Sequence, residues 1–221
     1  MNTIVDQPIA QLVAKQLLKI HAVSINTKKP YRYVSGMLAP VYTDNRLLIS
    51  HYPQWKIVLD AYRKVIRENL PHDADVLSGT ATAAIPHAAA LAYDLHMPMV
   101  YVRSSKKEHG KENQVEGEFV KGSNVLVIED LVSTGKSIQV NVEAVRGIGG
   151  TVTHCLAITT STLSAFEETV HNLHIELITL TNIQTVIEIA VLEKYISQKD
   201  GESVHLFLKD PKSWGHKMGF E

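Results

Sequence analysis

The alternation of strand-like and helix-like segments between residues 74 and 180 is the feature that most constrains how this chain can fold. Short apolar runs predict strands at 74–78, 99–102, 124–128, 151–159 and 173–180. Alanine-rich or amphipathic stretches between them predict helices at 83–95, 136–148 and 165–171. Strands that alternate with helices pair in parallel. The pattern therefore predicts an α/β fold, with a central parallel sheet covered by helices on both faces.

The segments that flank this alternation are predicted to be simpler. The chain begins with an amphipathic helix over 9–20, continues with short strands and turns over 26–44, and then forms a helix over 53–69 that Pro53 opens. After residue 182 it has helical character and ends in a polar tail. With 221 residues and no internal repeat, we expect a single domain spanning 1–221.

Composition and charge exclude several classes of partner. The formal net charge is −1, so no global field attracts nucleic acid or a membrane surface. The N-terminus has no signal-like apolar segment, and no apolar run approaches the roughly twenty residues of a membrane span. The single cysteine, Cys155, lies in an apolar run, which predicts a buried thiol in a reducing compartment. We therefore expect a cytoplasmic protein with no nucleic-acid or membrane partner.

The best candidate site follows the predicted strand at 124–128. Glu129 and Asp130 come directly after the apolar residues, at the strand end where open α/β sheets bind ligands. Small residues at 133–135 then lead into a helix, whose first N–H groups suit a phosphate. Two carboxylates can accept hydrogen bonds from vicinal ribose hydroxyls while the loop holds a phosphate. The arrangement predicts a site for a phosphorylated ribose.

Two other interpretations of this segment are weaker. Gly135-Lys136-Ser137 has the ending of a nucleoside-triphosphate loop, but that motif needs a glycine five positions before Gly135. Asp130 stands there, and its carboxylate would repel a triphosphate. The other interpretation is a solvated strand-to-helix turn with incidental acids.

Residues 127–137 closely resemble the phosphoribosyl-diphosphate signature of type I phosphoribosyltransferases. Three further stretches resemble the orotate phosphoribosyltransferase family. Residues 101–110 and 115–117 look like its mobile catalytic loop, 35–40 and 42–46 like its orotate-side motif, and 79–86 like the loop beside the diphosphate. The resemblance implies the type I phosphoribosyltransferase fold, with residues about 20–50 forming a small N-terminal hood.

The same resemblance implies an activity. The family transfers the 5-phosphoribosyl group from phosphoribosyl diphosphate to orotate, which gives orotidine 5′-phosphate and diphosphate in pyrimidine biosynthesis. It implies Mg²⁺ as cofactor, held mainly by the substrate and by no direct protein ligand. It also implies a homodimer in which the loop of one subunit covers the active site of the other.

The site residues that the resemblance implies fall into three groups. The catalytic residues would be Lys107, His109 and Asp130. The orotate-binding residues would be Ser133 and Arg46, with a structural role for Arg46 as the alternative. The residues that bind phosphoribosyl diphosphate would be Arg103, Lys107, His109, Glu129, Asp130, Leu131, Val132, Ser133, Thr134, Gly135, Lys136 and Ser137. The loop's cations, from Arg103 to Lys111, suit a diphosphate leaving group.

Several positions depart from the common family pattern. Leu38 and Ala39 stand where many members have Lys-Ser, and Val34 where some have lysine. The other departures are Ala84 for a glycine, Ser104 and Ser105 where a lysine is frequent, and Ser161 where one branch has tyrosine. Because none lies in the ribose-phosphate loop, donor binding is a firmer expectation than the acceptor base.

Two rival functions remain at this point. The first is a phosphoribosyltransferase for another base. The segment at 31–46 argues against a purine base, because family members that use purines usually lack it. The second is a regulatory protein that only binds phosphoribosyl diphosphate. Such regulators carry a DNA-binding domain, whereas about twenty-five residues precede the hood and the charge is near neutral.

Overall fold

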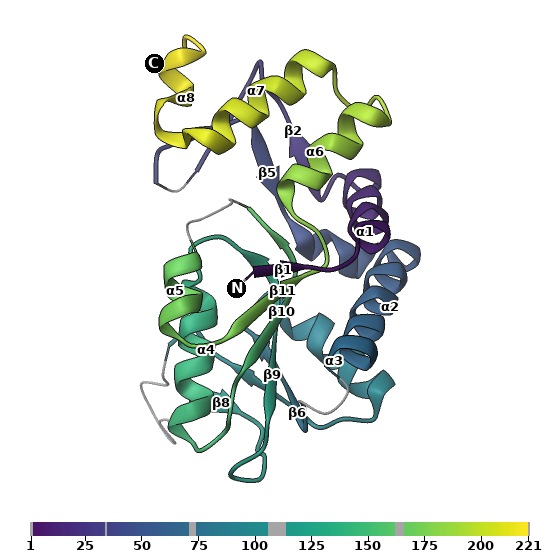
Figure 1. Cartoon of the computed structure of the whole chain (residues 1–221), viewed down its shortest axis with the longest axis vertical. Coiled ribbons are helices and arrows are strands. Elements are labelled where there is room, and N and C mark those ends of the chain that lie inside the picture. The colour runs from purple at the N-terminus through teal and green to yellow at the C-terminus, as the bar shows by residue number, and fades with distance from the viewer. Residues whose placement is uncertain (1, 34, 71–73, 106–113, 162–165, 221) are drawn as a thin grey trace.

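The computed structural model describes residues 2–33, 35–70, 74–105, 114–161 and 166–220, with only the backbone described for 2–4. A seven-stranded sheet forms the centre, in the order β1-β11-β10-β9-β6-β7-β8 (Figure 1). All its pairings are parallel except that of β8 with β7. The strands are β1 (Asn2–Ile4), β6 (Val76–Thr80), β7 (Met99–Val102), β8 (Val115–Glu116), β9 (Val125–Val132), β10 (His154–Thr160) and β11 (Glu176–Thr179).

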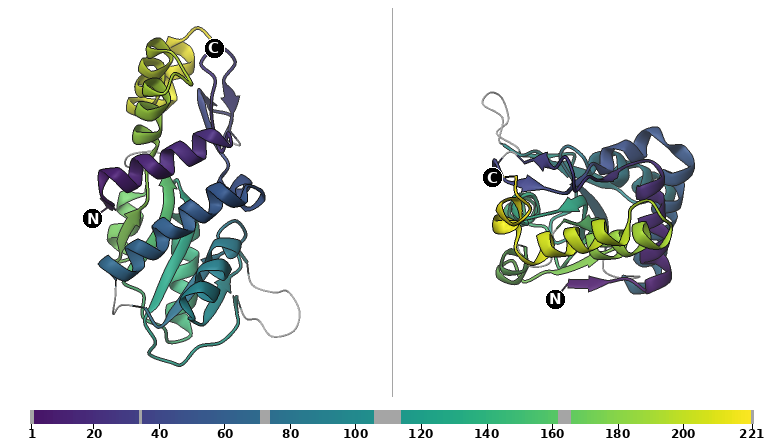
Figure 2. Two further views of the ribbon diagram at one scale, coloured as in Figure 1. Left: turned by 90° about the vertical axis from the view of Figure 1, so that its right-hand side faces the viewer. Right: turned by 90° about the horizontal axis from the view of Figure 1, so that it is seen from above.

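Helices cover both faces of this sheet, as the sequence predicts. One face carries α1 (Gln7–Lys19), α2 (Tyr52–Asn69) and α3 (Ile85–Leu95), and the other carries α4 (Lys136–Gly147) and α5 (Glu167–Asn172) (Figures 1 and 2). Among the described residues, no helix combines the length and apolar character needed to cross a lipid bilayer.

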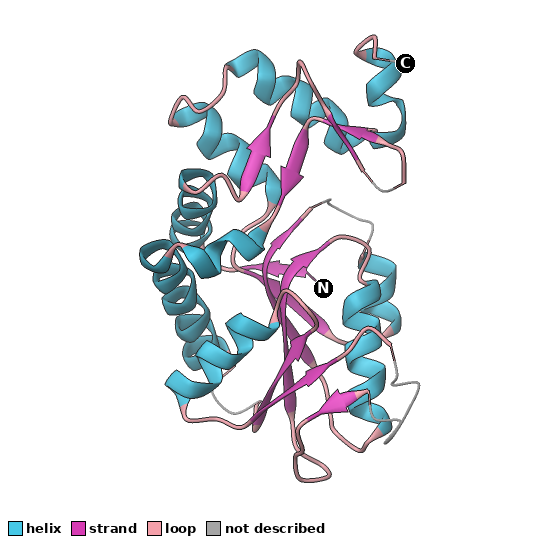
Figure 3. Cartoon of the chain, turned by 180° about the vertical axis from the view of Figure 1, so that it is seen from behind, coloured by secondary structure: helices cyan, strands magenta, loops and turns pink. Residues whose placement is uncertain are grey.

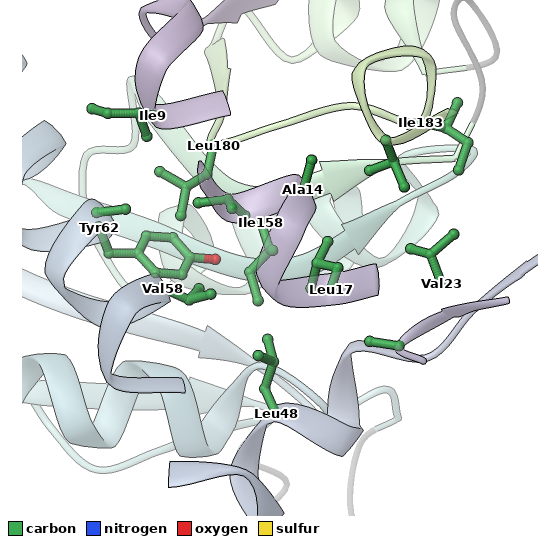
Figure 4. Packing of buried hydrophobic residues seen from close by; sticks show 14 of the residues in the cluster. Ile9, Ala14, Leu17, Val23, Leu48, Val58, Tyr62, Ile158, Leu180 and Ile183 are labelled. Carbon is green, nitrogen blue, oxygen red and sulfur yellow. The ribbon is translucent and has the colours of Figure 1, made fainter. Parts of the chain in front are cut away.

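The alternation of side chains along each strand divides the core into two layers. In β9, Leu126 and Ile128 pack toward α1 and α2, while Val125 and Val127 pack toward α4. Tyr62 of α2 lies in the first layer near Ile158 (Figure 4). Cys155 is fully buried in the second layer, which confirms the prediction of a core thiol. Because both faces of the central strands are buried, residues 125–128 of β9 form a continuous apolar run.

A smaller layer lies beyond the carboxyl ends of the central strands (Figure 3). It contains the antiparallel pairs β2 (Val23–Ile25) with β5 (Val41–Thr43) and β3 (Tyr31–Arg32) with β4 (Leu38–Ala39). The 3₁₀ helix η1 (Asn45–Ser50) then leads to α2. The chain closes with α6 (Ile183–Leu192), α7 (Gln198–Lys209) and α8 (Pro211–Lys217). We call residues 23–43 the hood, at the place where the sequence predicts one.

The end of the chain differs from the predicted polar tail. Residues 211–217 form α8, which contacts β4 of the hood. The Trp214 side chain is 1% exposed, and its Nε1 donates to Ser203 O at 3.0 Å. Leu38 and Ala39, the two hood departures, are buried. Apolar residues stand in β4 because α8 covers that strand.

The structure differs from the predicted elements at one boundary and at two short strands. The strand predicted to end at residue 128 continues to Val132, because β10 pairs with β9 up to Thr160. The segment at 115–117, which resembles the mobile catalytic loop, contains β8, a two-residue strand too short to give a periodic pattern. The N-terminal strand β1 was not predicted, and it adds to the sheet edge beside β11.

Candidate functional site

The strand order places a crevice between β6 and β9. From β6 the chain moves to β7 through α3, and from β9 it moves the other way to β10 through α4 on the opposite face. Such a point of reversal is where open α/β sheets bind ligands, outside the carboxyl ends of the strands. β9 pairs with β6 only as far as Ile128, so Glu129 and Asp130 extend beyond the end of its neighbour.

Two buried side chains hold this extension of β9 in place. Tyr62 of α2 donates its hydroxyl to Glu129 O at 2.7 Å. Asn45, the first residue of η1, donates Nδ2 to Asp130 O at 2.7 Å. Both side chains are 0% exposed, so these bonds form without competition from water. Asn45 lies within the predicted orotate-side motif at 42–46, although no role was assigned to it, and Tyr62 lies outside every predicted site segment.

The carboxyl groups of Glu129 and Asp130 differ in their burial. Glu129 is 4% exposed, and its Oε1 accepts from the Asp130 backbone N–H at 3.1 Å. Its Oε2 is buried and has no hydrogen-bond partner among the described residues. Asp130 is partly exposed. Asp130 therefore has access to a ligand from solvent, and Glu129 offers an acceptor that a hydroxyl group in the crevice would satisfy.

Burial controls the ionisation of this pair. It raises the pKa of Glu129 well above its usual range, and the neighbouring Asp130 charge raises it further. Burial also raises the pKa of Asp130, against the lowering effects of hydrogen bonds and of the nearby Arg46 charge. Two adjacent carboxylates in a poorly solvated site resist double ionisation. Without a ligand the pair therefore retains a proton more readily than free carboxyl groups do.

The segment between β9 and α4 presents an open helix terminus. Gly135 precedes α4 with φ = 80°, a left-handed conformation that favours glycine, and a Cβ there would lie 3.0 Å from Thr169. No side chain caps the helix. Ser133, Thr134, Lys136 and Ser137 are exposed around it, while Leu131 is partly buried and Val132 is buried. The first N–H groups of α4 are thus free to bind a phosphate.

A cavity of about 210 Å³ joins this helix terminus to two other predicted segments. It is lined by Thr80, Ala81, Val102, Arg103, Ser104, Lys136, Ser137 and Val140. The fold therefore brings Thr80, Arg103 and Lys136 together from three separate parts of the chain. Two cations at the start of an uncapped helix suit an anion with several oxygens.

Arg103 also marks the base of the predicted catalytic loop. Its backbone N–H donates to Gln114 O at 3.0 Å, and Gln114 Nε2 donates to Arg103 O at 3.0 Å. Its Nη1 lies 3.8 Å from Glu116 Oε1 and has no hydrogen-bond partner in the described chain. Of the loop itself, residues 106–113 lie outside the described residues, and with them the predicted catalytic residues Lys107 and His109.

Arg46 lies at the same end of the sheet but already has a partner. Its Nε lies 2.6 Å from Asp44 Oδ1, and its Nη2 lies 2.9 Å from Asp44 Oδ2. The side chain is 63% exposed, and its charge acts on Asp130. Asp44 thus orients the guanidinium beside the crevice, while Nη1 makes none of these bonds.

No group of three or more possible metal-ligating side chains occurs within the described ranges. The remaining departures surround the crevice: Ala84 is buried before α3, Ser104 and Ser105 are exposed, and the Ser161 N–H donates to Val132 O at 2.9 Å. Val34 lies outside the described residues.

Comparison with known proteins identifies the family. The model of the phosphoribosyl transferase domain matches residues 49–194. An orotate phosphoribosyltransferase from Coxiella burnetii is 44% identical over 203 residues, covering 91% of this chain and 96% of its own. The chain belongs to the orotate phosphoribosyltransferase family. A second such relative, from Enterococcus faecalis, is 41% identical over 207 residues, covering 94% of this chain and 98% of its own.

A solved structure supports the same assignment. The crystal structure of orotate phosphoribosyltransferase from Aeropyrum pernix has a TM-score of 0.72 and 31% sequence identity, and the match covers 84% of this chain and 99% of that one. The type I phosphoribosyltransferase fold inferred from residues 127–137 is thereby confirmed.

The buried Glu129 gives a prediction about stability. Its folded-state pKa lies above its unfolded value, so the unfolded chain loses the proton first as pH rises, and ionisation then favours unfolding. Glu129→Gln removes this cost and should stabilise the ligand-free protein at pH 8 by roughly 1–3 kcal/mol, the range for one unsatisfied buried group. The gain should vanish below about pH 4, where both states are protonated.

Thermal unfolding of both proteins from pH 4 to pH 8 measures this effect. The melting-temperature difference should widen with pH, by roughly 2–4 °C for each kcal/mol. A constant difference, or one that narrows as pH rises, would contradict the assignment of a raised pKa to Glu129.

Proposed function

We propose that this protein transfers the 5-phosphoribosyl group from phosphoribosyl diphosphate to orotate, giving orotidine 5′-phosphate and diphosphate. One observation carries the proposal. In a chain of this family, two partly desolvated carboxyl groups and an uncapped helix terminus meet at the point where the strand order reverses, beneath the hood. The reaction supplies a nucleotide to pyrimidine biosynthesis.

The donor's ribose 5-phosphate fits this arrangement in one orientation. The N–H groups at the start of α4, with the hydroxyls of Ser133, Thr134 and Ser137, hold the phosphate. Asp130 and Glu129 accept hydrogen bonds from the two vicinal ribose hydroxyls. The orphan Glu129 Oε2 supports this orientation, because a ribose hydroxyl supplies the donor that the described residues do not.

The transfer step requires electrostatic positioning and no protein nucleophile. The lone pair of an orotate ring nitrogen forms a bond to the anomeric carbon, the ring nitrogen loses its proton, and the bond to diphosphate breaks with its electrons on the leaving oxygen. Positive charge that develops on the sugar is stabilised by Asp130 and Glu129. Arg103 and Lys136, which line one cavity, neutralise negative charge on the phosphates, together with Lys107 and His109.

The acceptor binds on the hood side of the crevice. We assign the orotate carboxylate to Arg46, which Asp44 holds beside Asp130, and a contact with the base to Ser133. The bidentate geometry of a guanidinium suits a planar carboxylate. Mg²⁺, held mainly by the oxygens of the donor, would neutralise charge on the diphosphate.

We further propose that the protein acts as a homodimer in the cytoplasm. Leu47, Ile49 and Tyr52 are exposed on η1 and at the start of α2, next to Asn45, which contacts the site. Exposed apolar side chains so close to a catalytic crevice are typical of subunit contacts. The buried free thiol of Cys155 fits a reducing compartment.

Turnover with four bases tests the proposed function. Purified protein with phosphoribosyl diphosphate and Mg²⁺ should release diphosphate rapidly with orotate and at background rate with adenine, hypoxanthine or uracil. Comparable turnover with a purine would establish a different acceptor. Binding of the donor without any turnover would favour a regulatory protein.

Asp130→Asn tests the ribose contact. A neutral amide replaces a charge-assisted acceptor, so the substitution should lower kcat/KM by the equivalent of about 2 kcal/mol, roughly thirtyfold. The fold should persist, since Asp130 lies at an open strand end. Steady-state kinetics give the first quantity and circular dichroism the second; wild-type efficiency in the variant would remove Asp130 from the mechanism.

Removal of magnesium separates a substrate-borne metal from a structural one. Excess chelator should abolish turnover, and added Mg²⁺ should restore it, while the melting temperature stays within a degree or so of its original value. Unfolding on chelation would mean that the chain itself depends on a bound metal.

Mixed dimers test whether the site is shared. Lys107→Ala and Asp130→Ala should each be nearly inactive alone. If the loop acts across the subunit boundary, each mixed dimer holds one intact site, and equal mixing should restore about a quarter of wild-type activity. No recovery, with subunit exchange demonstrated by differently tagged chains, would show that each subunit uses its own loop.

A further inference from the structure

Two consecutive residues of η1 serve different sides of the crevice. Asn45 Nδ2 donates to Asp130 O at 2.7 Å, on the strand extension that carries the two carboxyl groups. The next residue, Arg46, has an exposed guanidinium whose charge acts on Asp130. The start of this short helix therefore connects the residue assigned to the acceptor with the residue assigned to the ribose of the donor.

Asp44 makes the start of η1 a single hydrogen-bonded unit. Asp44 Oδ1 accepts from the Arg46 backbone N–H at 3.2 Å and from Arg46 Nε at 2.6 Å, and Asp44 Oδ2 accepts from Arg46 Nη2 at 2.9 Å. The Asp44 backbone N–H donates to Ala22 O at 2.7 Å, directly before the hood. Asn45 lies between the two members of this ion pair in the chain. A ligand that orders the guanidinium therefore also restrains the backbone that places the Asn45 amide.

The orientation of the Asn45 amide is set by its partner. A backbone carbonyl can only accept, so the nitrogen of the amide must face Asp130 O. The other amide atom, Oδ1, is buried and has no hydrogen-bond partner among the described residues. A buried acceptor without a partner lowers the stability of the folded protein. An amide that fills a fully buried position at this cost indicates that its bond to β9 does more than fill space.

The packing of η1 does not depend on this bond alone. Leu48 is 0% exposed and belongs to the core cluster that also contains Val58 and Tyr62 of α2 (Figure 4). Tyr62 donates to Glu129 O, the carbonyl that precedes the partner of Asn45. Two separate elements thus hold the same strand extension, and of the two bonds the one from Asn45 is joined to the acceptor side of the crevice.

We propose that Asn45 is a positioning residue that couples the acceptor to the donor. Binding of the orotate carboxylate at Arg46 orders the start of η1, and Asn45 passes this order to Asp130, which then holds a ribose hydroxyl more tightly. This inference rests on the proposed function. Because coupling between two binding sites is reciprocal, bound donor raises the affinity for orotate by the same factor.

Binding measurements without turnover test the coupling. Ribose 5-phosphate has the phosphate and the vicinal hydroxyls of the donor but lacks the diphosphate leaving group. In isothermal titration calorimetry, orotate should lower the Kd of the wild-type protein for ribose 5-phosphate on the order of tenfold, within the usual range for linked sites. In Asn45→Leu, where the side-chain volume changes little, this ratio of Kd values should fall to about one. The Kd for orotate alone should stay near its wild-type value, since Asp44 and Arg46 are intact.

Tyr62→Phe is the matched control. It removes one hydrogen bond to the same strand extension, but from α2. It should weaken the binding of ribose 5-phosphate while the effect of orotate on that binding stays on the order of tenfold. Asn45→Ala, which cannot overfill the site, provides the same test if Asn45→Leu does not fold. Melting temperatures show that each variant is folded.

The kinetics should agree with the binding measurements. At saturating orotate, kcat/KM for phosphoribosyl diphosphate should fall on the order of tenfold in Asn45→Leu, the same factor as the lost coupling.

Three results would overturn the role of Asn45: a wild-type ratio of about one, a full ratio in Asn45→Leu or Asn45→Ala, or loss of the ratio in Tyr62→Phe as well. If the wild-type protein binds ribose 5-phosphate but not orotate, the proposed acceptor is wrong, and this inference is wrong with it.

Discussion

The site depends on β9 being longer than its neighbour β6. Pairing with β10 continues to Val132, whereas pairing with β6 stops at Ile128. The unpaired side of this extension would be an exposed strand edge if Tyr62 and Asn45 did not bind its carbonyl groups. These two hydrogen bonds connect α2 and η1 to the site, so that helix packing far from the crevice fixes the positions of Glu129 and Asp130.

The burial of two adjacent carboxyl groups lowers the stability of the folded protein. A carboxyl group at 4% exposure, next to another carboxyl group, is poorly solvated and partly unsatisfied before a ligand binds. The core on both faces of β9 is apolar and well buried, and it supplies the stability that tolerates this arrangement. In the proposed mechanism, a donor with two vicinal hydroxyls would relieve part of this cost where charge develops on the sugar.

Much of the fold could be predicted from the sequence, and so could the place of the candidate site. The alternation after residue 74 predicts the sheet and its helices, and the local chemistry of Glu129, Asp130 and Gly135 marks the candidate loop between β9 and α4. Contacts between distant segments leave no such local signal in the sequence. Asn45 lies in the predicted orotate-side motif and Tyr62 in a predicted helix, but their bonds to β9 form only when η1 and α2 pack against that strand.

The predicted boundaries failed where polar residues continue a strand. The apolar run ends at Ile128, but the backbone pairing that defines β9 does not depend on side-chain polarity. The inward position of Asn141 could not be predicted for a related reason. A single polar residue in an amphipathic helix looks like part of its solvated face, and only the register of α4 on the sheet shows that it points inward.

Segments near the N-terminus contact segments near the C-terminus. β1 pairs with β11, and the hood strand β4 is covered by α8. During synthesis, β1 and β4 can therefore form these contacts only after most of the chain has left the ribosome. The β6-to-β10 region contains Glu129, Asp130 and the start of α4 and relies on contacts between neighbouring segments, so it can assemble earlier. The hood gains its contact with α8 only after the strand ends beneath it can have formed.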